Sequence, residues 1–318
     1  MISSTSRVLV TGATGFVGRQ LMAALKQQGF DVIGTSRQPG AGLCVVAPLG
    51  PDTDWTAALA GCDAVVHLAA RVHVMNETAA DPLAEFRKAN VEGTAALARQ
   101  AAALGVKHFI FVSSIKVNGE QTQDRPFTAA DSPQPQDPYG ISKYEAEQAI
   151  KQICAQSAMT FTTVRPPLIY GPGVKANFQR LMRAVQGGKP LPLGSITHNR
   201  RSLVAVGNLN SLIIACLQNP AASGQVFLVS DGEDLSTAGL VRAIAQASEK
   251  KPVLLPVPVG LFRLAGKLTG KTAAIERLCG SLAVDISKNR ELLGWVPEFS
   301  TAQAMREAVA ADAGQEAR

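Results

Sequence analysis

Three glycines that follow directly on a short apolar run constrain the fold of this chain more than any other feature. The run Arg7-Val-Leu-Val-Thr11 has the pattern of a buried strand, and Gly12-Ala-Thr-Gly15-Phe-Val-Gly18 follows it at once. An amphipathic stretch continues to about Gly29, and residues 31–35 have the pattern of a second strand. Glycine permits a tight turn and a close approach of helix and strand. This order therefore predicts an opening βαβ unit.

The same alternation continues through the first half of the chain. We expect further strands and helices, and their order predicts an α/β fold with a Rossmann-like, doubly wound parallel sheet. The expected strands are residues 64–68, 107–112 and 159–165, and the expected helices are residues 54–60, 81–104 and 137–156.

After Gly173 the alternation loosens, which predicts a smaller C-terminal substrate-binding lobe. We therefore divide the chain into a dinucleotide-binding domain, residues 1–173, and a substrate-binding lobe, residues 174–318, and expect some strands near 202–229 to return to the main sheet. The expected elements of this part are strands 199–206 and 226–229 and helices 237–248 and 287–293.

The glycine turn also predicts a ligand. Backbone N–H groups at a helix start bind a pyrophosphate, and glycines let the backbone approach it closely. The pattern thus favours a dinucleotide. The predicted cofactor contacts in the turn are Gly12, Thr14, Gly15, Phe16, Val17 and Gly18.

Composition excludes several other classes of protein. The 318 residues carry a net charge of +6 without a basic run interleaved with aromatics, so we expect no nucleic acid partner. The five cysteines and four histidines are scattered, which predicts reduced thiols, a cytoplasmic location and no metal site. No apolar run is long enough to span a bilayer. Residues 252–268 form the most apolar stretch, read as a buried or groove-lining helix, with a membrane-surface contact as the weaker alternative.

The stretch Tyr139-Gly-Ile-Ser-Lys143 carries the candidate chemistry. Asp137 and Pro138 before it have the pattern of a helix start, so Tyr139 and Lys143 would lie one turn apart on one helix face. A free phenol ionises near pH ~10. A neighbouring ammonium group favours the phenolate, so we expect Lys143 to lower the pKa of Tyr139 into a useful range.

Several motifs in a fixed order resemble the extended short-chain dehydrogenase/reductase family, within it the nucleotide-sugar epimerases and reductases. They are the glycine turn, His67-Leu-Ala-Ala70, Ala89-Asn-Val-Glu-Gly-Thr94, Val112-Ser-Ser-Ile-Lys-Val-Asn-Gly119, Pro138-Tyr-Gly-Ile-Ser-Lys143, Arg165-Pro-Pro-Leu-Ile-Tyr-Gly-Pro-Gly173 and Leu293-Gly-Trp-Val-Pro297. The resemblance implies three catalytic residues: Tyr139 as general acid/base, Lys143 beside the nicotinamide ribose, and Ser114 as a hydrogen-bond partner of the reacting oxygen. It places Leu68, Ala69 and Ala70 at the cofactor, which would pass over the two small alanines. It also places Asn90 near the cofactor, although a structural role is nearly as well supported, and His67 at a strand end in a structural role.

The end of the second strand bears on the choice of cofactor. Dinucleotide folds that prefer NAD place an acidic residue there, whereas this chain has Ser36 followed by Arg37. Serine and a guanidinium can bind a 2′-phosphate that a carboxylate would repel. We therefore expect NADP(H), with NAD(H) as the alternative. The resemblance leaves the adenine contacts open, because Pro48-Leu49 replaces the usual acidic residue.

The resemblance also implies a nucleotide-sugar substrate, with UDP as the nucleotide. Arg201 matches the arginine that pairs with the diphosphate, and Arg200 lies beside it in the sequence. Asn177 is similar to a nucleotide-contacting residue, and Lys116 follows the catalytic serine closely. These four residues are the predicted substrate contacts.

The motifs leave more than one reaction open. Ile115-Lys116-Val117 stands where the 4,6-dehydratases carry an Asp-Glu pair, so we expect no dehydratase. The resemblance favours an NAD(P)H-dependent reductase for the 4-keto group of a UDP-linked 6-deoxy-N-acetylhexosamine, as in bacterial O-antigen and lipopolysaccharide biosynthesis. A UDP-sugar 4-epimerase with tightly bound NAD is the alternative; a non-catalytic dinucleotide-binding regulator and a reductase of apolar substrates are weaker ones. Two alanine-rich helices favour a homodimer.

Overall fold

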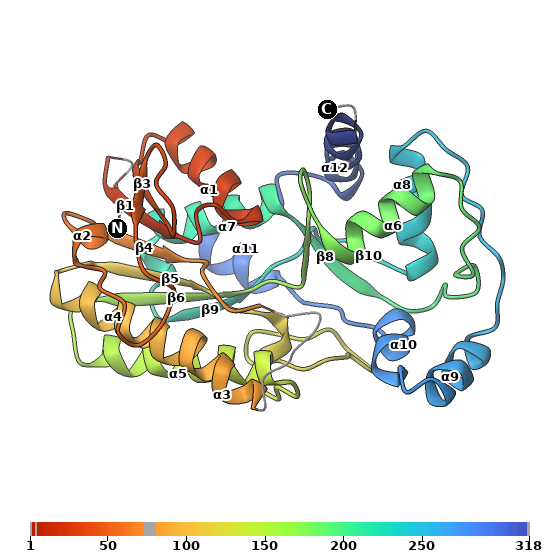
Figure 1. Ribbon diagram of the computed structural model, residues 1–318, viewed down its shortest axis with the longest axis horizontal. Helices are drawn as coiled ribbons and strands as arrows, with labels where there is room; N and C mark the ends of the chain where they lie inside the picture. Colours follow the sequence, from red (N-terminus) through yellow and green to blue (C-terminus); the bar gives the residue numbers. More distant parts are fainter. Residues whose placement is uncertain (1, 4, 73–80, 317–318) are drawn as a thin grey trace.

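The computed structural model describes residues 2–3, 5–72 and 81–316, and its core is a seven-stranded sheet (Figure 1). The strand order is β3-β2-β1-β4-β5-β6-β9, and every neighbouring pair is parallel. The α/β, Rossmann-like doubly wound sheet expected from the sequence is therefore confirmed. Its strands are β1 (Arg7–Thr11), β2 (Asp31–Ser36), β3 (Leu43–Val45), β4 (Ala64–His67), β5 (His108–Val112), β6 (Thr160–Arg165) and β9 (Gln225–Leu228).

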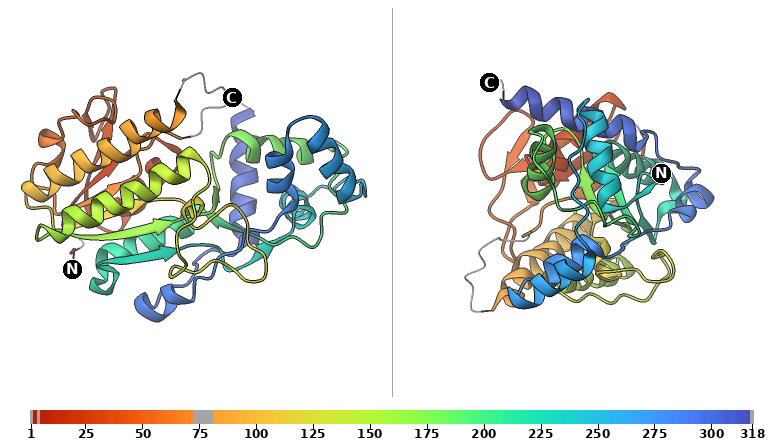
Figure 2. Two further views of the ribbon diagram at one scale, coloured as in Figure 1. Left: turned by 90° about the horizontal axis from the view of Figure 1, so that it is seen from below. Right: turned by 90° about the vertical axis from the view of Figure 1, so that its right-hand side faces the viewer.

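Helices cover both faces of this sheet (Figure 1). One face is covered by α1 (Phe16–Gln27) and α7 (Val206–Gln218), whose apolar residues join one core cluster with the strands. The other face is covered by α4 (Gly93–Ala103) and α5 (Pro138–Ala155), which lie side by side (Figure 2). Because both faces are buried, β4 and β5 have no exposed residue, which explains their continuous apolar pattern.

The segment expected as one helix, residues 81–104, contains a π-helical turn. It consists of α3 (Pro82–Phe86), the π-helix η1 (Arg87–Glu92) and α4. Asp81 caps the start by accepting a hydrogen bond from Ala84 N at 3.0 Å. A π turn changes the direction in which side chains project, and such turns are frequent at functional sites. Asn90 lies inside this turn.

The smaller lobe has a three-stranded sheet of its own, in the order β10-β8-β7. Its core contains apolar residues of α6, α8 and α12. Of the strands expected to return to the main sheet, β9 does so beside β6, whereas β8 belongs to this second sheet. The lobe contains β7 (Leu168–Tyr170), β8 (Arg201–Ala205), β10 (Asp234–Leu235), α6 (Ala176–Gln186), α8 (Thr237–Ala247), α9 (Val259–Leu268), α10 (Thr272–Cys279) and α12 (Thr301–Glu316).

Short elements complete the chain. They are α2 (Thr56–Leu59), the 3₁₀-helices η2 (Ile115–Val117) and η3 (Pro220–Ala222), and α11 (Ser287–Leu293). None of the helices in the described ranges is long and apolar enough to cross a membrane.

Two expectations about surfaces differ from the structure. The stretch 252–268 is not a buried helix, because Leu261, Leu264 and Leu268 on α9 are exposed. The apolar residues of α4 and α5 pack within one protomer, as Leu97, Ala101 and Ile150 are fully buried, so these helices show no surplus apolar face. The homodimer stays a prediction.

Strand order also locates the site. β1 lies between β2 and β4, and connections leave these central strands in opposite directions along the sheet. In such sheets ligands bind beyond the carboxyl ends of the strands at this switch point. The segments after Thr11 and His67 meet there, because the two residues are paired across β1 and β4.

Candidate active site

A groove of about 840 Å³ lies at this switch point. It extends from the glycine turn to the segment after β4, and the end of β2 also lines it. Most of the cofactor contacts predicted from the sequence line it: Gly12, Thr14, Gly15, Phe16, Val17, Gly18, Ser36, Arg37, Leu68, Ala69 and Ala70. Its other lining residues include Val46, Pro48, Leu49 and Trp55.

The glycine turn fits a pyrophosphate for two reasons. Gly12 has a φ of +67°, and a Cβ at Gly18 would lie 2.2 Å from the carbonyl oxygen of Gly12, so the turn cannot form this way with side chains there. Gly15 caps α1 without a side-chain hydrogen bond, and no acidic residue lies in the first turn. The first N–H groups of α1 are thus left to an anion.

A buried network fixes the backbone opposite the glycine turn. The Thr11 hydroxyl accepts hydrogen bonds from Leu68 N and Ala69 N, both at 3.1 Å, and lies 2.6 Å from His67 Nδ1. Burial lowers the pKa of His67 to about 3, so its ring is neutral. Thr11 therefore donates its own hydrogen to Nδ1, and His67 Nε2 donates to Thr94 Oγ1 at 2.9 Å. His67 is structural, as the resemblance implied.

Asn90 holds the next residues of the same loop. Its Oδ1 accepts from Arg71 N at 2.7 Å, and its Nδ2 donates to Arg71 O and to Ser142 Oγ, both at 3.0 Å. The side chain is buried and all of its donors and one of its lone pairs are used within the protein. Asn90 thus connects the groove wall to α5, the helix that carries Tyr139, and it does not line the groove itself.

The helices that begin beside Tyr139 and Ser114, α5 and η2, pack against each other at their starts. Ser114 caps η2 and accepts a hydrogen bond from Lys116 N at 3.3 Å, while Asp137 caps α5 and accepts from Gly140 N at 2.6 Å. The Lys116 ammonium group forms an ion pair with Asp137, so the two caps are joined. A Cβ at Gly140 would lie 3.1 Å from Lys116 O, so glycine is needed for this close approach.

The electrostatics of the catalytic pair differ from the expectation. Burial, with a smaller contribution from Asp137, raises the pKa of Tyr139 to about 12. Burial also lowers the pKa of Lys143 to about 7. The Lys143 ammonium group donates to Val112 O at 2.9 Å and lies 4.5 Å from the ring centre of Phe111. The expected lowering of the Tyr139 pKa by Lys143 is therefore wrong for the chain alone, because burial disfavours the charged phenolate.

The buried ion pair between Arg165 and Glu147 was not predicted from the sequence. Arg165 at the end of β6 donates to both carboxylate oxygens of Glu147, at 2.9 and 2.5 Å, and both side chains are almost fully buried. Ser113 Oγ donates to Glu147 at 2.5 Å, and Arg165 also donates to Asn118 Oδ1 at 2.9 Å. The signal in the sequence for a charged residue at this place was the position of Glu147, four residues after Lys143 on the same helix.

The four predicted substrate contacts differ in their surroundings. Arg201 is half-buried, its Nη1 donates to Arg277 O at 2.8 Å and Gly280 O at 3.2 Å, and in the described part of the chain no carboxylate lies within 4 Å of it. Burial and the nearby Arg277 lower its pKa. Among the described residues, neither Arg201 nor Arg277 forms an ion pair, and two such cations suit a diphosphate.

The other three fit a substrate less well. Arg200 is exposed and forms an ion pair with Asp234, with 3.0 Å between Nη2 and Oδ2. Lys116 is paired with Asp137 and with Glu120. Asn177 is exposed near the start of α6. Their roles in substrate binding stay predictions.

Comparisons with known proteins agree with this geometry. Residues 8–230 match the NAD dependent epimerase/dehydratase family, which is most of the chain. The chain belongs to this family. It is similar to a Vibrio cholerae UDP-glucose 4-epimerase, with 47% identity over 91% of this chain and 90% of that protein. It is also similar to an Escherichia coli O157:H7 N-acetyl-alpha-D-glucosaminyl-diphospho-ditrans,octacis-undecaprenol 4-epimerase, with 30% identity over 94% and 92% of the two chains.

Solved structures with this fold include other proteins of similar length. The UDP-N-acetylglucosamine 4-epimerase of Bacillus cereus superposes with a TM-score of 0.80 over 98% of this chain and 100% of its own, at 22% identity. At this identity the match establishes the fold. The resemblance to nucleotide-sugar epimerases and reductases inferred from the motifs is confirmed by the family and the curated relatives.

In this epimerase/dehydratase chain, the end of β2 is open to solvent. Ser36 Oγ accepts a hydrogen bond from Gln38 N at 3.1 Å and so stabilises the turn after the strand. Arg37 is exposed at the rim of the groove. Both residues lie where the adenosine ribose is expected, and the preference for NADP(H) stays a prediction.

Replacing Ser36 with Asp, or Arg37 with Ala, tests this preference. Each change should weaken binding of NADPH about tenfold or more, because the 2′-phosphate loses a charge-assisted hydrogen bond or meets a carboxylate. NADH has no 2′-phosphate, so its affinity should change little. Titration calorimetry with both cofactors measures the ratio, and Lys26→Ala, at the far end of α1, is the matched control. Equal changes for the two cofactors would show that Arg37 plays no part in the choice.

Trp55 is a groove residue that sequence analysis missed. Its side chain is almost fully buried and lines the groove with Pro48 and Leu49. Its indole Nε1 has no hydrogen-bond partner among the described residues. Trp55 thus supplies an aromatic wall in the region where the expected acidic contact is replaced. A lone tryptophan between polar residues gives no such signal in the sequence.

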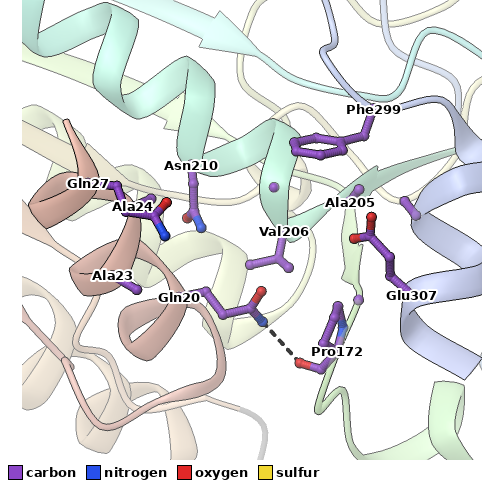
Figure 3. A pocket seen from close by; sticks show the side chains of 13 residues that line it. Gln20, Ala23, Ala24, Gln27, Pro172, Ala205, Val206, Asn210, Phe299 and Glu307 are labelled. Carbon is purple, nitrogen blue, oxygen red and sulfur yellow. Dashed lines mark hydrogen bonds between the residues drawn. The ribbon is translucent and has the colours of Figure 1, made fainter. Parts of the chain in front are cut away.

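A second cavity, of about 270 Å³, lies behind the glycine turn (Figure 3). It is bounded by α1, α7 and α12 and contains none of the predicted site residues. Gln20 on α1 donates across it to Pro172 O at 3.0 Å. This bond connects the cofactor-binding helix to the loop that follows β7, where the smaller lobe begins.

Proposed function

We propose that this protein is a UDP-sugar 4-epimerase that uses NAD and acts on a UDP-linked hexose or N-acetylhexosamine. The single observation that carries the proposal is the 47% identity to a UDP-glucose 4-epimerase over nine-tenths of both chains. The geometry supports it, because the groove lies at the switch point of the sheet and Asn90 connects its wall to α5, the helix that carries Tyr139 and Lys143.

The chain's own residues suit the expected cofactor. The glycine turn and the uncapped start of α1 would hold the pyrophosphate, and Lys143 would bond the nicotinamide ribose. The bound nicotinamide supplies a hydride acceptor and donor for the sugar C4. Arg201 would bind the diphosphate of the substrate and so orient the sugar toward Tyr139.

The proton steps fall to Tyr139 and Ser114. As the phenolate, Tyr139 would take the proton from the C4 hydroxyl during oxidation of C4 and would give it back when C4 is reduced. Because burial raises the pKa of this phenol to about 12, it must first lose its own proton, which the positive charges of Lys143 and of an oxidised nicotinamide would favour. Ser114 donates a hydrogen bond to the reacting oxygen and holds it near the phenol. Phe86 packs edge-on against the Tyr139 ring, with 6.1 Å between ring centres, and so holds the phenol in place.

The reductase that the motifs favoured is the competing function. The curated relatives support the epimerase better, since both carry that activity in their names. Ser36-Arg37 is the observation that favours an exchangeable NADPH and hence a reductase. The second relative acts on a sugar carried by undecaprenol diphosphate, and Arg201 fits that carrier as well, because both carriers present a diphosphate beside the sugar.

Retention of the cofactor separates the two functions. The epimerase should keep NAD through purification, and denaturation should release about one equivalent per chain, because the hydride returns to the same sugar and the cofactor need not leave. With no cofactor added, UDP-N-acetylglucosamine or UDP-glucose should be converted to its C4 epimer, as followed by NMR. Stoichiometric loss of NADPH absorbance with a UDP-linked 4-keto-6-deoxy-N-acetylhexosamine, together with a nucleotide-free preparation, would instead identify the reductase.

A further inference from the structure

Helix α9 lies at the outer end of the smaller lobe (Figures 1 and 2). It exposes an apolar face. Leu261, Leu264 and Leu268 are 56%, 54% and 79% exposed and recur at helical spacing on one face. Val253 and Leu255, just before the helix, are also exposed. In the described part of the chain, five of the eleven exposed large apolar residues thus fall within 16 consecutive positions.

This face belongs to a helix that is packed in place. On the opposite side Val259 and Phe262 pack against the core of the smaller lobe. Gly266 faces α10, where a Cβ would lie 2.9 Å from Ile275 Cγ1, so the two helices are in close contact. The leucines are therefore not exposed because α9 is detached from the lobe. One side of the helix is packed against the lobe, and the leucines lie on the opposite side.

Basic side chains border the exposed leucines. On a helical wheel, Arg263 and Lys267 lie between the core-facing side and the leucine side, and Lys271 follows the helix. Six basic and two acidic residues occur between 249 and 280, a surplus of four positive charges, whereas the whole chain has a net charge of +6. Among the described residues, Arg263 pairs with Glu276, with 3.4 Å between Nε and Oε1, and Lys267 and Lys271 form no ion pair.

We propose that α9 and the start of α10 dock on an anionic phospholipid bilayer. Leu261, Leu264 and Leu268 would enter the boundary between headgroups and acyl chains, and Lys267 and Lys271 would lie among the phosphates. Helices with an apolar face and a lysine-rich border bind in this way without crossing the membrane.

The charge pattern favours a bilayer over the other occupants of such a face. A second copy of the chain would bring two surfaces with the same positive surplus together, which is repulsive. The centre of a protein interface is depleted in lysine. An anionic bilayer has apolar acyl chains beneath a layer of negatively charged headgroups. This matches α9, where lysines border a face of leucines.

The docking face is connected to the expected diphosphate site. The carbonyl groups of Arg277 and Gly280, at the end of α10, accept hydrogen bonds from Arg201. Binding of α9 to a membrane would therefore hold Arg201 close to the bilayer surface. This inference does not depend on the proposed reaction, since attachment to a membrane can be measured without turnover.

Flotation with lipid vesicles tests the proposal. The full chain should bind vesicles of phosphatidylcholine and phosphatidylglycerol in equal parts, bind phosphatidylcholine vesicles much less, and lose binding as salt is raised. Leu264→Ser/Leu268→Ser and Lys267→Glu/Lys271→Glu should each reduce binding roughly tenfold or more. Leu104→Ser, which changes a leucine of 48% exposure beyond α4, and Lys151→Glu on α5 are the matched controls and should bind like the wild type.

Two further measurements separate a loss of membrane binding from a loss of folding or of activity. Circular dichroism should show unchanged unfolding midpoints for all variants, and turnover of a soluble UDP-sugar should be unchanged, because none of these residues belongs to the site. Absence of wild-type binding to the anionic vesicles, or equal losses in the control variants, would overturn the proposal. A wild-type oligomer that Leu264→Ser/Leu268→Ser dissociates, without vesicle binding, would assign the face to a second copy instead.

Discussion

Tyr139→Phe is expected to lower kcat by a factor on the order of a hundred or more while leaving cofactor affinity nearly unchanged. The change removes the hydroxyl that exchanges the proton with the sugar, and general acid–base groups typically contribute about 10²–10⁴-fold to the rate. The ring remains, so its edge contact with Phe86 and the packing at the start of α5 are retained.

The structure makes this loss hard to compensate. Phenylalanine has no group that donates or accepts a proton, and the ring of Phe86 packs edge-on against this position. Lys143 cannot take over the role, because its ammonium group is held by Val112 O and the ring of Phe111.

The matched control is Tyr144→Phe, a half-buried tyrosine on the same helix. It should retain normal kcat, and both variants should bind NAD with the affinity of the wild type in a fluorescence titration. Near-normal turnover by Tyr139→Phe would show that Tyr139 does not transfer the proton, and the site as proposed would then lack a proton donor.

Arg165→Met is expected to destabilise the protein by about 3–5 kcal/mol, the range for removing one partner of a buried ion pair. Glu147 would keep a buried charge with one hydrogen bond from Ser113 and without the guanidinium that pairs with both of its oxygens. The measurement is the free energy of unfolding from denaturant titration followed by circular dichroism. In the same experiment the exposed ion pair of Arg125 and Asp131 supplies the control, and Arg125→Met should leave the transition unchanged.

A double variant separates the charge from the packing. Arg165→Met/Glu147→Leu removes both ions and should recover a large part of the stability that Arg165→Met loses, because no uncompensated charge remains. If Arg165→Met unfolds at the same denaturant concentration as the wild type, the buried pair does not stabilise this core. The pair also matters to the site, since Ser113 precedes Ser114 and Glu147 lies one turn beyond Lys143.

Local patterns in the sequence were sufficient to predict the main sheet and its glycine turn. A parallel sheet needs continuous apolar strands alternating with helices, and a tight turn needs glycine, so both leave signals within a few consecutive residues. Strands β1, β4, β5 and β6, helix α5 with its Asp137 cap, and the glycine turn were all expected where they occur. The hypothesis that Tyr139 and Lys143 carry the chemistry also depends on residue types one helical turn apart, and it stays a prediction.

What only the tertiary structure decided depends on contacts between distant residues. The pKa of Tyr139 is set by burial beneath α3 and not by the lysine next to it on the helix, so the spacing alone predicted the wrong direction. The pairing of Glu147 with Arg165, the clamp of Asn90 on Arg71, and the place of Trp55 in the groove join segments that the sequence keeps apart. The exposure of residues 252–268 could also not be predicted locally, because apolar content does not show which face of a helix a neighbour covers. Phe262 packs against the smaller lobe, and the leucines of α9 are therefore exposed.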